Sequence, residues 1–308
     1  MIQHQKRFRL VAGIVAGTAI ILALMSFFYL KSQKPLSPNE KVVPVFHQTF
    51  HKDGILFEKN GLLHFIDAKS GKDIVLCDKP NCPHTGSAVN RPQPTCNAAI
   101  DGICMDGYGI YRGQLYFISQ TDSGGIFNKE IYQADVNGAN RKRIAELENV
   151  EFIENVTYVD EYLLVPYITQ HDPDSPNVEL EKPIVGMAAI NLSTYEVTYI
   201  PTKEGYNPSI WQAHEYKGEF YYIYTYLDIK TNEDETVDEQ NHFFVELYSY
   251  DPATKSETKL VGGNNLSFLA FDGVYVYLIE RTGEVNHVVQ INLDEGTKEA
   301  IFQVTDFH

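Results

Sequence analysis

The sequence predicts an all-β chain, a β-propeller with about five countable blades and room for a sixth, preceded by one transmembrane helix. Three observations support this prediction. A long apolar stretch follows a basic amino terminus, a paired-hairpin pattern then recurs five times, and helical periodicity is nearly absent after residue 34. We expect a cytoplasmic head at 1–9, the membrane helix at 10–30, a linker at 31–44 and an extracytoplasmic propeller at 45–305.

The membrane helix is predicted from 21 uncharged residues between Leu10 and Leu30. At about 1.5 Å rise per residue they cross a hydrocarbon core of roughly 30 Å. Lys6, Arg7 and Arg9 precede them, which favours a cytoplasmic amino terminus. A cleaved secretory signal is the alternative, although its apolar core is shorter, roughly 7–15 residues. We expect a single-pass plasma-membrane protein whose residues 10–30 contact the lipid and whose main domain is extracellular.

The charge is distributed unevenly along the chain. Residues 1–34 carry five basic side chains and no acidic one, so the remainder holds 20 Lys and Arg against 41 Asp and Glu. Such an acidic domain repels phosphate groups, which argues against nucleic acid as a partner. Solubility explains the excess of acids, and a cationic partner or a metal ion is the alternative explanation.

Each repeat begins with a short turn followed by a strand rich in β-branched and aromatic residues. The second turn positions are separated by steps of 59, 48, 57 and 55 residues, and they are Gly54, Gly113, Glu161, Gly218 and Gly273. A second hairpin follows in every repeat, with an Asx-type turn at Asp67, Asp135, Asn191, Asp251 and Asn292. A β-sandwich also has short, evenly spaced strands, but it would not repeat one turn chemistry in successive units.

All four cysteines lie in one loop, residues 77–104, between the first and second repeats. Outside the cell an even number of cysteines usually forms disulfides, and Cys77–Cys82 with Cys96–Cys104 is the pairing we favour among the three possible. The alternative is a Cys₃His zinc site made of Cys77, Cys82, His84 and Cys96. Its spacing is irregular for zinc, and an oxidising exterior disfavours free thiolates.

The segment from Leu76 to Ala98, LCDKPNCPHTGSAVNRPQPTCNA, lies between the apolar stretch and hairpins of the form G-x-L-Y-F and L-Y-x-x-D. In this it resembles a group of bacterial membrane-anchored surface proteins with propellers like those of lipoprotein-receptor ectodomains. The resemblance implies architecture and location, and it carries no activity. This chain departs from the receptor propellers because it has no Tyr-Trp-Thr-Asp tetrapeptide.

Two acidic loops, 170–183 and 228–242, interrupt the repeats. Oxygen ligands suited to calcium occur in the first loop at Asp172, Asp174, Asn177 and Glu179. Neither loop has the glycine-centred spacing of a helix-loop-helix calcium site, so a solvated loop is the simpler interpretation.

Motifs for common chemistries are absent: there is no G-x-S-x-G, H-E-x-x-H, P-loop or dinucleotide-binding sequence. We therefore expect a binding module that engages a protein or glycan on one propeller face. The alternatives are a cell-envelope glycan hydrolase or lyase and a structural subunit of a membrane complex. No cofactor is expected, with zinc at the cysteines or calcium at the acidic loop as the alternatives.

Overall fold

The computed structural model describes residues 43–45, 48–84, 96–99, 107–123, 126–169, 183–228 and 242–304. The predicted head, the predicted membrane helix and nearly all of the predicted linker lie outside these ranges. Within them every regular element is a β-strand, as predicted. No helix in the described ranges is long and apolar enough to cross a membrane.

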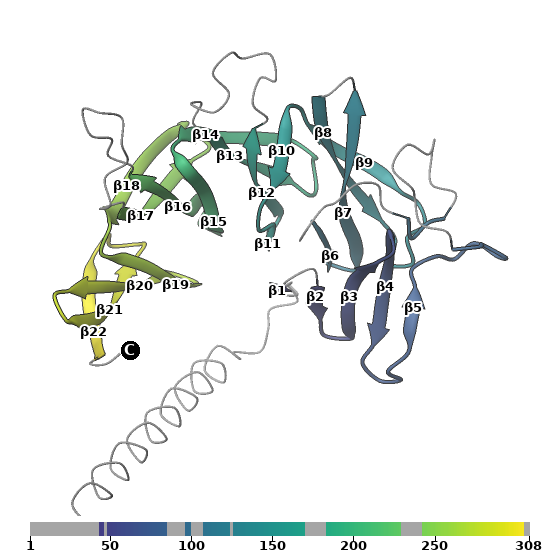
Figure 1. Cartoon of the computed structure of the whole chain (residues 1–308), viewed down its shortest axis with the longest axis horizontal. Coiled ribbons are helices and arrows are strands. Elements are labelled where there is room, and N and C mark those ends of the chain that lie inside the picture. Colours follow the sequence, from purple (N-terminus) through teal and green to yellow (C-terminus); the bar gives the residue numbers. More distant parts are fainter. Residues whose placement is uncertain are drawn as a thin grey trace, which may run out of the picture. The chain divides into compact units, whose positions relative to one another are not determined.

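The strands form five antiparallel sheets, each built from consecutive segments of the chain (Figure 1). The first sheet contains β1 (Val43–Val45), β2 (Gln48–His51), β3 (Gly54–Lys59), β4 (Leu62–Asp67) and β5 (Asp73–Val75). The second contains β6 (Tyr108–Tyr111), β7 (Gln114–Ser123), β8 (Ile126–Ala134) and β9 (Lys142–Leu147). The third contains β10 (Val150–Ile153), β11 (Thr157–Val159), β12 (Tyr162–Thr169), β13 (Ile184–Asn191) and β14 (Val197–Glu204), with β10 and β11 both pairing with β12.

The fourth sheet contains β15 (Tyr206–Tyr216), β16 (Glu219–Asp228), β17 (His242–Asp251) and β18 (Ser256–Gly263). The fifth contains β19 (Leu266–Asp272), β20 (Tyr275–Thr282), β21 (Val285–Asn292) and β22 (Lys298–Val304). Each sheet is thus an up-and-down meander, which is the strand order of a propeller blade.

The repeated turns lie where the sequence predicts them, with a shift of one residue in two repeats. Arg112 and Gly113 have φ of 50° and 73°, and Lys217 and Gly218 have φ of 53° and 86°, the left-handed values of a two-residue hairpin. In the first repeat the turn ends one residue earlier, so Gly54 is already the first residue of β3. In the fifth repeat the turn begins at Gly273 and extends one residue further.

The predicted Asx turns are also present. Asn191 Oδ1 accepts the amides of Ser193 and Thr194, both at 2.9 Å, and the side chains of Asp67, Asp251 and Asn292 accept backbone amides in the same way. Asp135 differs, because its Oδ2 accepts the side-chain amide of Asn140 at 2.6 Å. These contacts fix the second hairpin of each sheet.

Consecutive sheets share their buried side chains. Strand β16 shows how, because its neighbouring residues point to opposite faces of the sheet. Phe220, Tyr222 and Tyr224 pack with the third sheet, whereas Tyr221 and Ile223 pack with the fifth. The long apolar run of β16 is therefore explained by burial on both faces.

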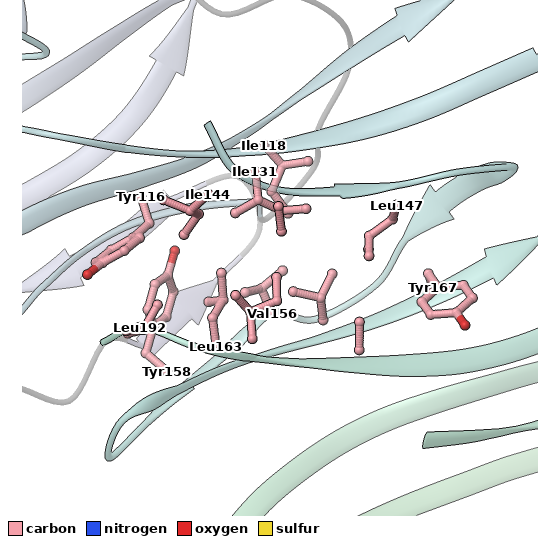
Figure 2. Packing of buried hydrophobic residues seen from close by; sticks show 14 of the residues in the cluster. Tyr116, Ile118, Ile131, Ile144, Leu147, Val156, Tyr158, Leu163, Tyr167 and Leu192 are labelled. Carbon is pink, nitrogen blue, oxygen red and sulfur yellow. The ribbon is translucent and has the colours of Figure 1, made fainter. Parts of the chain in front are cut away.

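The same arrangement holds between the second and third sheets (Figure 2). Tyr116, Ile118 and Leu147 from the second sheet face Tyr158 and Leu163 from the third, and all are at most 8% exposed. Comparable clusters join the first sheet to the second, the third to the fourth, and the fourth to the fifth. The hydrophobic core is thus a series of layers between sheets.

Polar contacts cross the layer between the third and fourth sheets. Glu154 accepts hydrogen bonds from Ser209 Oγ at 3.0 Å and from the Ile210 amide at 2.9 Å. Burial raises the pKa of this carboxyl, although the two hydrogen bonds oppose the shift. Lys203 of β14 pairs with Glu257 of β18 at 2.7 Å. These contacts fix the register between the two sheets.

We expect Leu164→Ala to lower the free energy of unfolding by about 2–5 kcal/mol, because it leaves a cavity in the layer between the third and fourth sheets. Leu164 is fully buried there. The control is Leu269→Ala, the same substitution at a side chain that is 46% exposed, which should cost less than about 1 kcal/mol. Urea denaturation of the detergent-solubilised chain measures both. Equal losses would contradict the layered core.

Candidate metal centre

The cysteine segment begins directly after the last strand of the first sheet. The Leu76 amide donates to the Leu63 carbonyl at 3.0 Å, so the chain still follows β4 one residue before Cys77. It then turns back, and the Cys82 amide donates to the Lys79 carbonyl at 3.3 Å. This turn brings Cys82 close to Cys77.

Cys96 reaches the same place from the other end of the loop. The Leu63 amide donates to the Ala98 carbonyl at 2.8 Å, and Ala99 forms an antiparallel bridge with Leu62. The segment Cys96–Ala99 thus extends the first sheet beside β4. Its Asn97 side chain donates to Asp78 Oδ1 at 2.6 Å, which connects the two parts of the loop.

Four potential metal ligands converge here. The ligand atoms of Cys77, Cys82, His84 and Cys96 all lie within 4.8 Å of one another. The distance from Cys96 Sγ to His84 Nδ1 is 3.7 Å. Cys96 is 1% exposed, Cys77 and Cys82 are half-buried, and His84 is at the surface. These four residues are the Cys₃His zinc site that the sequence analysis named as the alternative to disulfides.

Backbone amides point at two of the sulfurs. Burial raises the pKa of Cys77, but hydrogen bonds from the Lys79 and Asn97 amides and from two thiols outweigh it and hold this pKa below its ordinary value. The Ala98 amide donates to Cys96, yet burial and the neighbouring sulfurs raise the pKa of Cys96 to about 12. The site therefore favours one thiolate and opposes a second when no cation balances the charge.

The four ligand atoms are spread somewhat more widely than the ligands of a tetrahedral zinc ion. With metal–sulfur distances of about 2.3 Å and metal–nitrogen distances of about 2.0–2.1 Å, neighbouring ligand atoms lie roughly 3.4–3.8 Å apart. Four protein ligands fill such a coordination sphere and leave no position for a substrate. Chemically, the arrangement can hold a structural ion rather than activate a water molecule.

The structure describes only part of the predicted disulfide residues and none of the predicted calcium ligands. Cys77, Cys82 and Cys96 carry free thiols in this structure. Cys104 lies outside the described residues, as do the calcium candidates Asp172, Asp174, Asn177 and Glu179. The two-disulfide arrangement stays a prediction.

Sequence reasoning missed Arg141, which holds the cysteine segment from the second sheet. Its Nη2 donates to the carbonyls of Asn97 and Ala99, the latter at 2.7 Å, and its guanidinium lies 4.8 Å from the centre of the Phe117 ring. Gly138, in the turn before β9, packs against Leu76 and Asn97. Neither role has a sequence signal, since these residues are more than 35 positions from Cys96 in the chain.

No family model matches the sequence, and no curated protein is significantly similar to it. Distant likenesses exist among solved structures. An oligogalacturonate lyase in complex with manganese aligns over 81% of this chain and 61% of its own length, with 14% identity and a TM-score of 0.42. Porphyromonas gingivalis dipeptidyl peptidase 4 aligns over 88% and 40%, with 9% identity and a TM-score of 0.47.

A Synechocystis apocarotenoid oxygenase variant aligns over 90% of this chain and 62% of its own length, with 14% identity and a TM-score of 0.43. This chain therefore spans less than two thirds of the length of each of these three structures. At such identities and TM-scores, these likenesses assign no activity, substrate or metal to the chain.

We expect Gly138→Ala to destabilise the protein by about 3 kcal/mol. Its φ is +81°, and an added methyl carbon would lie 2.5 Å from the Leu76 carbonyl oxygen. The control is Gly71→Ala, where φ is +65° but no atom lies within 4 Å, so only the backbone cost of about 1–2 kcal/mol applies. Thermal unfolding compares the two. Equal losses would show that the turn does not support the cysteine segment.

Proposed function

We propose that the chain is a membrane-anchored extracytoplasmic binding module, a β-propeller whose partner is a cationic protein segment. The observation that carries this proposal is the placement of the two acidic insertions. Residues 170–182 connect β12 to β13, and residues 229–241 connect β16 to β17. These are equivalent connections in two consecutive sheets, because each follows the strand that begins after the first turn of its repeat.

The equivalent connections elsewhere are short. Only Asn60 and Gly61 separate β3 from β4, and two residues separate β7 from β8 and β20 from β21. The insertions are therefore not needed to close a hairpin. Long loops on a rigid scaffold are a common place for binding residues.

Charge supports a cationic partner. Residues 170–182 contain four carboxylates and one lysine, and residues 229–241 contain five carboxylates and one lysine. The third and fourth sheets pack directly on each other, so equivalent connections start from the same end of their strands. We call this end of the two sheets the binding edge. Two acidic loops at one edge produce a local negative potential that attracts and orients a positively charged partner.

The anchor and the orientation come from the amino-terminal sequence. The apolar stretch 10–30 supplies a membrane helix, and the basic residues before it place the remainder of the chain outside the cytoplasm. In this arrangement the binding edge is presented at the cell surface. The linker sets its distance from the lipid.

The orientation is tested by adding protease to intact cells that carry the chain with a carboxy-terminal epitope tag. We expect the tag to be lost while a cytoplasmic marker protein stays intact. A short fragment containing residues 10–30 should remain in the membrane fraction. Full protection of the tag in intact cells, with digestion only after lysis, would contradict the proposed orientation.

Binding is tested with a fluorescent octalysine peptide and the full chain in a neutral detergent, followed by fluorescence anisotropy at low salt. Replacing the five acids of the second loop with their amides should weaken binding about tenfold, equivalent to about 1.4 kcal/mol. These acids are Glu233, Asp234, Glu235, Asp238 and Glu239.

The matched control neutralises five exposed acids at or near the turns at the opposite ends of the strands, namely Asp53, Glu196, Asp272, Glu295 and Glu299. It reduces the net negative charge by the same amount, so it should weaken binding by less than about twofold if position matters rather than total charge. Equal weakening in the two variants would show that the peptide only senses net charge. No measurable binding by the unmodified chain would also count against the proposal.

A further inference from the structure

We propose that Cys77, Cys82, His84 and Cys96 bind one zinc ion in a closed tetrahedral site that fastens the segment Cys96–Ala99 between the first and second sheets. This site is independent of the proposed binding edge on the third and fourth sheets.

The donor set is the first support. Three sulfurs and one imidazole nitrogen lie within 4.8 Å of one another, and a shift of about 1 Å per atom brings them to the spacing that zinc requires. A disulfide needs only two sulfurs and gives no reason for a third sulfur and a histidine to meet them. Thiolate and imidazole ligands also exclude magnesium and calcium, which prefer oxygen.

The second support is the hydrogen bonding of the sulfurs. The Lys79 amide donates to Cys77, and the Ala98 amide donates to Cys96, in each case from two residues further along the chain. Each turn therefore places a backbone amide donor at its own sulfur. A thiolate accepts amide hydrogens and a metal ion at the same time, so these amides act as the outer partners of a thiolate site.

The third support is the position of the site in the core. Cys96, Ala98 and Ala99 belong to the buried cluster shared by the first and second sheets. Arg141 and Gly138 of the second sheet contact this segment from one side, and Leu63 of β4 holds it from the other. Nineteen positions separate Cys77 from Cys96 in the chain, so an ion that joins them closes a long loop and removes freedom from the unfolded chain.

Metal content is the first test. The full chain, purified in detergent without chelator or reductant, should contain about one zinc per chain and no other metal in stoichiometric amount. Replacing zinc with Co²⁺ should give the intense visible absorption of a tetrahedral cobalt–thiolate site. Cys82→Ser and His84→Ala should weaken Co²⁺ binding at least as much as loss of an outer-shell partner does, about 10–100-fold.

Two control variants separate the zinc site from the disulfides and from other histidines. Cys104→Ser should keep the zinc, whereas a Cys96–Cys104 disulfide would be broken by it. His287→Ala removes a half-buried histidine from the fifth sheet and should also keep the zinc. Zinc retained at full occupancy in Cys82→Ser, or stoichiometric iron in place of zinc, would overturn the assignment.

The fastening role has its own test in hydrogen exchange. Chelation of zinc should speed exchange of the Leu63 amide, whose acceptor is the Ala98 carbonyl at 2.8 Å. The control is the Leu293 amide, bonded to the Val274 carbonyl of the fifth sheet at the same distance, whose exchange should not change. This comparison remains informative even if a ligand variant fails to fold, because it uses the unmodified chain.

Three further results would overturn the proposal. The first is a chain with no free thiol and no metal. The second is a chain whose thiols are all free but which binds neither Zn²⁺ nor Co²⁺. The third is a bound zinc whose removal leaves the exchange rate of the Leu63 amide unchanged, as it leaves that of the Leu293 amide.

Discussion

The fold depends on burial of both faces of each inner sheet against its neighbours. A four-stranded meander cannot cover its own faces, so its apolar side chains remain exposed until another sheet packs on them. Strand β16 contributes alternate residues to two different layers, and this accounts for its nearly unbroken run of aromatic and aliphatic residues. At the layer between the third and fourth sheets, Glu154 and Lys203 add polar contacts that join the two sheets.

The layer between the first and second sheets is built differently. Its first-sheet strands are short, with only three residues in β5, and part of the buried surface is supplied by the cysteine segment. That segment contributes small side chains, Cys96, Ala98 and Ala99, rather than large ones. Burial of small side chains stabilises less than burial of leucine or tyrosine, so the Arg141 contacts and the zinc ion that we propose have more to contribute here than polar contacts have elsewhere.

Much of the fold could be predicted because its signals are local. A glycine at the second turn position and an Asx residue in the next hairpin act within a few residues, and Gly113, Gly218 and Asn191 have the predicted conformations or contacts. Cys77, Cys82, His84 and Cys96 could be named as candidate ligands because they occur in one loop. Their convergence could not be predicted, since it depends on Leu63 and Arg141, which no short spacing connects to the cysteines.

The turn position in the first repeat shows the same limit on a smaller scale. Gly54 fits the repeated turn pattern, yet it is the first residue of β3, where an added methyl would collide with Ile66 and Phe65 across the strand pair. The glycine is there for close packing rather than for a left-handed turn. One residue type can satisfy either need, and only the tertiary structure distinguishes them.

The layered core also limits how far the effect of a sequence change extends. In the described part of the chain, each large buried cluster is shared by two consecutive sheets. Substitutions in layers without a common sheet therefore have separate partners, and their effects on unfolding should add. A lineage could thus lengthen the insertions of the third and fourth sheets, or lose the cysteines of the first layer, without compensating changes at the other end of the domain. In evolutionary terms, the scaffold is modular at the level of the single sheet.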